Sequence, residues 1–203
     1  MRSWLIALFL LCVSLCCACF TRAPDNQPHE QVQPTPQAKK GPPDQPKNGQ
    51  PEWIEFGKAW RQEGTEVQIT KAVVGKLILT AIGGGVYDSS DESAIVYFRV
   101  LNHSTTKKFN HLSWVRGALY DGPTMKDEFG NSYHISTGAT TRIAGFDISK
   151  SLYPGDETKD LVAFEKPIAK ATRLDIDLPA SHCDGKGRIR FRIPVSAFER
   201  QQP

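Results

Sequence analysis

Three neighbouring residues of types used by cysteine enzymes and metal sites, His182, Cys183 and Asp184, stand together near the C-terminus. A cysteine nucleophile needs a base within hydrogen-bond reach, and a third group must orient that base. Adjacent side chains of an extended chain point to opposite sides, so these three converge only if a tight turn joins them. Distant His111 or His134 would have to supply the base. Catalysis, copper or zinc binding and an ordinary loop thiol are the alternatives, and the spacing favours the last.

A second candidate is the acidic segment Asp88-Ser89-Ser90-Asp91-Glu92, which places three carboxylates in a predicted loop. Calcium prefers several oxygen ligands, but the EF-type arrangement of ligands around a fixed glycine is missing. We therefore interpret the segment as a solvated acidic turn, with a calcium site as the alternative.

Other motifs that carry chemistry are missing from the sequence. It contains no histidine pair at the zinc-protease spacing, no Gly-x-Ser-x-Gly elbow and no glycine loop that opens a helix. Asn102-His103-Ser104 is a formal glycosylation sequon, but we expect it to close a strand through side-chain hydrogen bonds. The sequence thus predicts a protein that is not an enzyme and has neither a metal site nor a cofactor.

The remaining cysteines lie in an apolar N-terminal segment, so no disulfide can form within the folded part. They are Cys12, Cys16, Cys17 and Cys19. Arg2 is followed by an almost wholly apolar stretch from Trp4 to Leu15, which is the layout of a signal peptide. This stretch is shorter than the roughly 20 residues that a spanning helix needs.

Two cleavage sites are compatible with residues 1–19 as a signal peptide with a lipoprotein-like end. Ala18 before Cys19 fits the lipoprotein pattern, although Cys16 stands where Leu is expected. Lipidation of Cys19 would hold the protein stably on a membrane of the cell envelope. Cleavage after Ala23 is the alternative, and it would release a soluble secreted or periplasmic protein.

Residues 20–51 have a different composition, with eight prolines, six glutamines and almost no aliphatic side chains. Such a segment buries too little apolar surface to offset the entropy of ordering, so we expect a disordered linker. Extended polyproline geometry would let it reach up to about 90 Å.

Residues 52–203 are expected to form one domain of short strands. The clearest strand is Ile95 to Leu101, with Val96, Phe98 and Val100 on one face and Tyr97 and Arg99 on the other. Other strands are predicted at 67–74, 76–80, 112–115, 132–135, 141–146, 161–164, 173–178 and 188–193, with helical turns at 52–60 and after Pro194. Strands separated by Gly and Pro turns predict an all-β, immunoglobulin-like antiparallel sandwich, with Trp114 in its core.

Four motifs in order resemble those of a known family. They are the strand Tyr97 to Leu101 with Asn102-His103-Ser104, the hairpin Asp127 to Tyr133, the turn Leu152 to Asp156, and Leu161 to Pro167. Together they resemble domain of unknown function 4352, an immunoglobulin-like domain of exported bacterial lipoproteins. The resemblance covers about residues 65–193 and departs in the long stretch Thr105 to Lys126. It implies fold and location, and it carries no catalytic residues.

The formal charge of +3 is small and the isoelectric point is about 8.6. Because Lys and Arg alternate with Asp and Glu, we expect no nucleic-acid partner. The final two predicted strands carry their charges on one face, so Arg188, Arg190 and Arg192 form either a cationic stripe or a set of ion pairs. We predict ion pairs, with Asp177 near Arg188 and Asp175 near Arg190.

The predicted function is that of an envelope domain that binds an unknown protein, glycan or small ligand. We predict that aromatic residues in the loops contact this partner, because aromatic residues dominate binding surfaces. They are Tyr120, Phe129, Tyr133, Phe146 and Tyr153, and at least half of these rings are expected to be core residues instead. The alternative is an envelope metal carrier or sensor that uses His residues and Cys183.

Overall fold

The computed structural model describes residues 52–81, 83–115, 121–136 and 142–201. The signal segment 1–19 with Cys19, the linker 20–51 and Tyr120 lie outside these residues. The described part is an all-β sandwich, which confirms the predicted immunoglobulin-like fold class. No helix in this part is long and apolar enough to cross a membrane.

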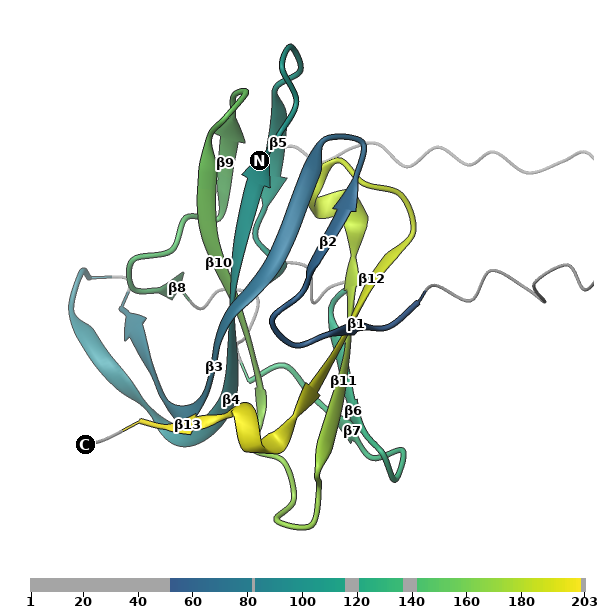
Figure 1. Cartoon of the computed structure of the whole chain (residues 1–203). Coiled ribbons are helices and arrows are strands. Elements are labelled where there is room, and N and C mark those ends of the chain that lie inside the picture. Colours follow the sequence, from purple (N-terminus) through teal and green to yellow (C-terminus); the bar gives the residue numbers. More distant parts are fainter. Residues whose placement is uncertain (1–51, 82, 116–120, 137–141, 202–203) are drawn as a thin grey trace, which may run out of the picture. The chain divides into compact units, whose positions relative to one another are not determined.

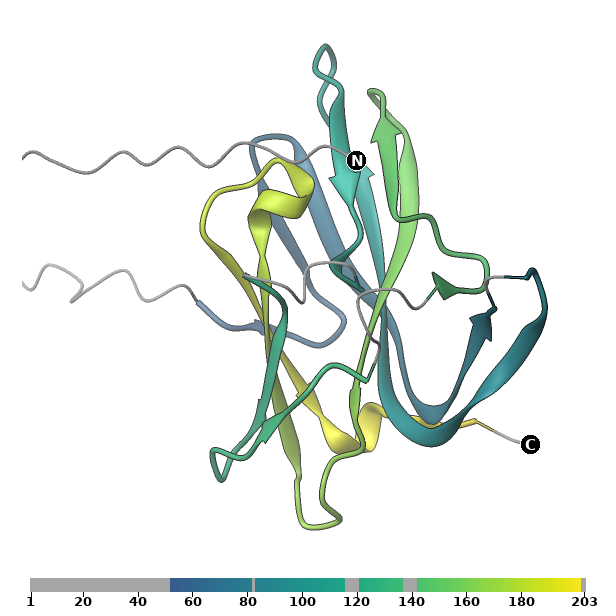
Figure 2. The same cartoon turned by 180° about the vertical axis from the view of Figure 1, so that it is seen from behind.

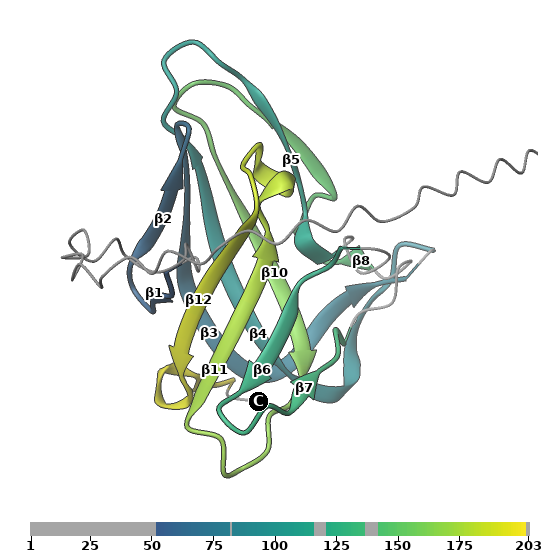
Figure 3. The same cartoon turned by 90° about the vertical axis from the view of Figure 1, so that its right-hand side faces the viewer.

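Two sheets pack face to face. The five-stranded sheet in front in Figure 3 has the order β1 (Ile54–Glu55), β12 (Arg188–Pro194), β11 (Arg173–Pro179), β6 (Thr124–Asp127) and β7 (Ser132–Tyr133). The six-stranded sheet has the order β10 (Glu157–Glu165), β4 (Val86–Asn102), β3 (Thr65–Thr80) and β13 (Glu199–Arg200), while β2 (Ala59–Gln62) and β8 (Arg142–Ile143) also pair with β3. A separate pair consists of β5 (Phe109–Leu112) and β9 (Ser149–Leu152). The pairing is antiparallel except where the short strands β1 and β13 join their neighbours.

The main core lies between the two sheets, as strand alternation predicts. Strand β4 is central, and its Val96, Phe98 and Val100 are fully buried while Tyr97 and Arg99 face the other side. Trp114 is also fully buried, and its ring centroid lies 5.2 Å from that of Phe98. The prediction that Trp114 belongs to the core is confirmed.

A smaller apolar cluster covers the opposite face of the six-stranded sheet. Register shifts in the pairing of β3 with β4 bend the far ends of both strands, which turn back beside β8 (Figures 1 and 2). Leu77 and Ile143 thereby pack on Ile95 and Leu161. Because both faces of β10 are covered, its apolar residues form a continuous run and not an alternation.

The hairpin of β11 and β12 has the predicted faces but a different register. Leu174, Ile176 and Leu178 on β11 and Ile189, Phe191 and Ile193 on β12 are buried. Asp177 lies opposite Arg190 and Asp175 opposite Arg192, two residues from the predicted pairing. The connection causes the shift, because it forms the 3-10 turn η2 (Ala180–Cys183) and not a simple loop. Asp177 still contacts Arg188, and the arginines are ion-paired as predicted.

Several predicted boundaries were wrong. The segment 52–60 contains β1 and part of β2 instead of a helical turn, and the strands predicted at 67–74 and 76–80 are one strand, β3. The acidic segment Asp88 to Glu92 lies within β4 and not in a loop. Strand β5 ends where the strand 112–115 was expected to begin, and β6 and β9 were not predicted. The helical turn after Pro194 is confirmed as η3 (Val195–Ala197).

Candidate binding surface at the loop end

Asn102 organises one end of the sandwich. It is almost fully buried at the end of β4, and its Nδ2 donates hydrogen bonds to the carbonyls of Lys107 (2.8 Å) and Leu152 (3.0 Å). Its Oδ1 accepts a hydrogen bond from the Ser104 backbone at 2.9 Å. The sequon Asn therefore closes the strand as predicted, and its amide is not exposed for modification.

Four turns lie together at this end of the sandwich, and we call them the loop end: residues 62–65, 103–108, 153–156 and 184–187. His103 N donates to the Gly64 carbonyl at 2.6 Å, and Gly155 N donates to the Asn102 carbonyl at 2.8 Å. Lys107 pairs with Asp184, and Lys186 pairs with Glu63 at 3.0 Å. The turns lie together at the top of Figure 1, so segments distant in sequence form one surface.

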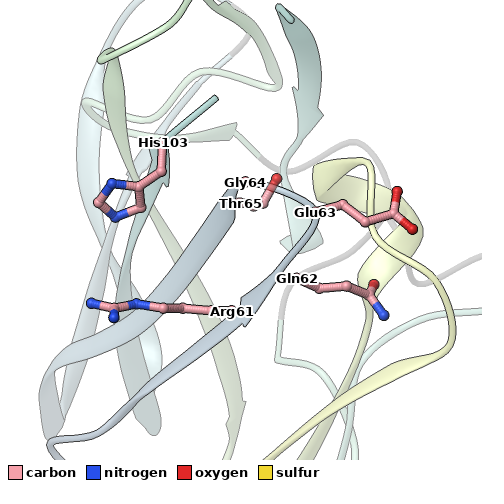
Figure 4. A pocket seen from close by; sticks show the side chains of 6 residues that line it. All are labelled: Arg61, Gln62, Glu63, Gly64, Thr65 and His103. Atoms are coloured by element: carbon pink, nitrogen blue, oxygen red, sulfur yellow. The ribbon is translucent and has the colours of Figure 1, made fainter. Parts of the chain in front are cut away.

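The β2–β3 turn approaches the next loop closely because of its glycine. Glu63 and Gly64 both have positive φ, 49° and 87°, as a two-residue hairpin turn of the primed type requires. A Cβ on Gly64 would lie 3.2 Å from the Ser104 nitrogen. An open depression of about 340 Å³ lies beside this turn and is lined by Arg61, Gln62, Glu63, Gly64, Thr65 and His103 (Figure 4).

The carboxylate of Glu66 holds the cationic side of this depression in place. Its side chain is 5% exposed, and it contacts Arg61 at 2.7 Å, Arg99 at 3.0 Å and His103 Nε2 at 3.0 Å. Burial opposes ionisation of Glu66, but hydrogen bonds with His103 and Arg61 outweigh it and keep the pKa of the carboxyl below its usual value. Arg61 and His103 remain substantially exposed, so both can face a ligand.

A second polar cluster resembles a catalytic triad in composition but not in arrangement. Asp160 accepts hydrogen bonds from Ser113 Oγ at 2.6 Å and from the Trp114 backbone at 2.9 Å, and its Oδ2 lies 2.9 Å from His111 Nε2. The aspartate thus stands between the serine and the histidine, whereas nucleophilic catalysis needs the histidine next to the serine. All three side chains are buried. The cluster fastens β5 and the Trp114 segment to β10.

The His182-Cys183-Asp184 side chains do not form a site. Cys183 is fully buried, and burial raises the pKa of its thiol to about 12, so the thiolate that catalysis or metal binding needs is disfavoured. Asp184 has a left-handed backbone conformation and pairs with Lys107. Among the described residues, no group of three His, Cys, Asp or Glu side chains is placed to hold a metal ion.

The predicted aromatic contacts are not brought together. Tyr153 is 55% exposed at the loop end, where Lys108 Nζ lies 5.6 Å from its ring centroid, whereas Phe129 is 63% exposed at the opposite end. Tyr133 is buried, and Phe146 packs partly buried on Tyr97. Tyr120 lies outside the described residues.

Sequence reasoning missed Arg61, Glu66 and His103. Glu66 was the one residue that could have pointed to this cluster. It is an acidic residue directly before buried Val67, and it lies opposite Arg61 across the Glu63-Gly64 turn.

No protein-family model matches the chain, and no curated protein does. Among solved structures, the yjhA protein from Bacillus subtilis aligns with a TM-score of 0.46 at 10% identity, covering 68% of this chain and 98% of that one. An uncharacterized β-sandwich protein from Clostridium difficile aligns with a TM-score of 0.43 at 9% identity, covering 74% of this chain and 99% of that one.

Proposed function

We propose that this protein is a non-enzymatic binding domain, held in a bacterial cell envelope by a lipid on Cys19, and that the loop end contacts its partner. The observation that carries the contact surface is that buried Asn102 holds turns 103–108 and 153–156 together, while His103 N donates to Gly64 of turn 62–65. A surface fixed before binding loses less conformational entropy when a partner docks. The order of sequence motifs resembling domain of unknown function 4352 supports the same class.

The chemistry of the loop end suits a polar partner with a ring or flat group. Tyr153 offers an exposed aromatic face, and Arg61 and His103 offer donors beside the depression. Cations and carboxylates alternate across the surface, as in the Lys107–Asp184 and Lys186–Glu63 pairs. A protein or glycan with both polar groups and a stacking surface fits this arrangement.

Site-specific photocrosslinking in intact cells tests the contact surface. A photoreactive amino acid in place of Tyr153 should give a discrete crosslinked product. The same amino acid in place of Lys71, an exposed residue of β3 away from the loop end, is the matched control. Equal products from both positions, or none from Tyr153, would contradict the proposal.

Labelling with a palmitate analogue tests the anchor separately. The wild-type chain should take up label, and Cys19→Ala should abolish the label and release the protein from membranes. An unlabelled wild type whose mature end is Pro24 would show that cleavage follows Ala23 instead.

A further inference from the structure

The ring of His111 faces a hydrogen-bond acceptor at each of its two nitrogens. Nδ1 lies 3.1 Å from the backbone carbonyl of His182, and Nε2 lies 2.9 Å from the carboxylate of Asp160. A carbonyl oxygen only accepts hydrogen bonds, so Nδ1 must carry a proton. A neutral imidazole has a single N–H, so the contact with Asp160 needs a second proton, on the ring or on the carboxyl group.

The hydrogen bonds to Asp160 suit a carboxylate and not a carboxylic acid. Ser113 Oγ donates to Oδ1 at 2.6 Å, Leu161 N donates to Oδ1 at 2.8 Å, and Trp114 N donates to Oδ2 at 2.9 Å. Donors at both oxygens stabilise the charged form. The second proton therefore lies on Nε2 of His111, and the ring is an imidazolium. The ion pair is almost fully buried, with side chains that are 3% and 1% exposed.

The groups of η2 that face this pair carry no charge at neutral pH. Burial, and after it the charge of His111, lowers the pKa of His182. Burial also raises the pKa of the Cys183 thiol to about 12. The 3-10 turn therefore offers no ion that could replace the imidazolium.

The charged side chains around the pair are engaged elsewhere. Lys150 lies opposite His111 on β9, but its Nζ donates to a backbone carbonyl of β10 at 3.2 Å. Asp121 and Asp184 are held in ion pairs with other side chains. Within the described part of the chain, His111 is the only ion-pair partner of Asp160. Loss of the second proton would leave a buried carboxylate without a cation, which is costly.

The pair also links two of the loop-end turns. Strand β5 follows turn 103–108, and η2, the yellow coil beside β5 in Figures 2 and 3, leads into turn 184–187. His111 holds β5 to η2 through Nδ1 and to β10 through Nε2. Because a neutral ring can make only one of these two bonds, loss of a proton breaks one of the two links.

We propose that the proton shared by His111 and Asp160 controls the loop end, so that raising the pH loosens turns 103–108 and 184–187 and weakens binding there. The control of binding rests on the proposed function, in which the loop end is the contact surface. The loosening itself rests only on the hydrogen bonds of His111.

Proton counting gives the direction of the pH effect. A histidine of the unfolded chain loses its proton near about pH 6.5, whereas the folded pair retains it. The contribution to stability is therefore complete below that pH and is lost as the folded pair gives up its proton. Until then, the opening equilibrium constant should rise by up to about tenfold for each pH unit, because one proton is released on opening.

Nitrogen NMR of the full-length protein tests the protonation directly, with isotope-labelled histidine and detergent micelles around the anchor. About one pH unit above the titration of free histidine, both ring nitrogens of His111 should carry protons, whereas His182 should carry one. His111→Gln assigns the signals. A His111 ring with a single proton under these conditions would overturn the inference.

Hydrogen exchange of the same protein measures the loosening. Protection of the amides of residues 180–187, corrected for the intrinsic exchange rate, should fall as the pH rises above neutral. His111→Gln cannot titrate, so its protection should be low and independent of pH. His134→Gln, at an exposed histidine outside the loop end, is the matched control and should behave as the wild type. Protection that does not change with pH in the wild type would overturn the inference even if His111→Gln failed to fold.

Photocrosslinking from residue 153 in intact cells separates this inference from the proposed function. The crosslinked product should weaken at alkaline pH in the wild type and in His134→Gln. A product that stays constant while turn 184–187 loosens would overturn the control of binding. No product at any pH, with protection that still falls, would instead refute the contact surface and support the proton-dependent link.

Discussion

The two faces of β12 differ in how much each side chain contributes to stability. Ile189 is fully buried in the main core, whereas Arg190 lies on the outer face with Asp177 at 3.0 Å and the Trp53 ring at 5.7 Å. Ile189→Ala should therefore lower the free energy of unfolding by about 2–5 kcal/mol. Arg190→Ala should lower it by about 1 kcal/mol or less. Urea denaturation of both variants measures the difference, and similar losses would mean that this face is not solvated.

The stability of the protein should depend on pH through the carboxylate of Glu66. Its pKa in the folded chain is below the usual 4.5, so the stability it contributes is complete above that value and is lost as the pH falls through the lower folded pKa. Glu66→Gln should cost about 1–3 kcal/mol at neutral pH, because Arg61 and Arg99 lose a charged acceptor. The gap from the wild type should close in acid.

Chemical denaturation at neutral and acid pH measures this gap, and Glu63→Gln on the exposed turn is the control. A loss from Glu66→Gln that is the same at every pH would show that the charge of Glu66 is not what stabilises the turn.

Sequence reasoning succeeded for side chains whose neighbours are near in the chain. The buried faces of β4, β11 and β12 follow from alternation, and the strand-closing role of Asn102 follows from its own hydrogen bonds. The cluster around Glu66 could not be predicted, because it needs Arg99 and His103 to reach Glu66 from another strand and its loop. For the same reason, the sequence could not show that Tyr153 and Phe129, two loop aromatics, lie at opposite ends of the sandwich.

At the scale of elements, the β2–β3 turn depends on its glycine in two ways. Gly64 needs both a positive φ and space beside Ser104, whereas Gly84 has a positive φ of 89° with no atom near its missing Cβ. Gly84→Ala should cost about 1–2 kcal/mol for the left-handed backbone alone. Gly64→Ala should cost more, because Ser104 must also move. Thermal melts of the two variants measure this, and equal shifts would mean that the contact with Ser104 is dispensable.

Elements stabilised by distant partners were the ones that the sequence misassigned. The segment 52–60 looked helical because strands β1 and β2 are short, and β1 gains its hydrogen bonds from β12 at the other end of the chain. The register of β11 with β12 was shifted because η2 and left-handed Asp184 take up residues that a simple hairpin loop would not. Strand type is set locally, whereas strand ends and register are set by tertiary partners.

At the scale of the whole molecule, the start of the domain is fixed by contacts and not only by composition. Ile54 and Phe56 pack partly buried on the main core, and Phe56 N donates to the Arg192 carbonyl at 3.0 Å. The Trp53 ring centroid lies 5.0 Å from the Arg192 guanidinium. A cation–π contact of this kind contributes about 0.5–1 kcal/mol to stability at an exposed site.

These contacts make residues 53–56 part of the sandwich, and we predict that the domain begins near them, which cleavage of the chain can test. The composition of residues 20–51 predicts that limited proteolysis removes them and leaves a fragment beginning near Pro51. A chain that begins at Pro51 should melt at the temperature of the full protein. A chain that begins at Lys58 lacks β1, Trp53 and Phe56 and should melt about 5 °C lower. Calorimetry measures the melting temperatures of the two chains. If these temperatures were equal, β1 would belong to the linker, and the sandwich would begin at β2.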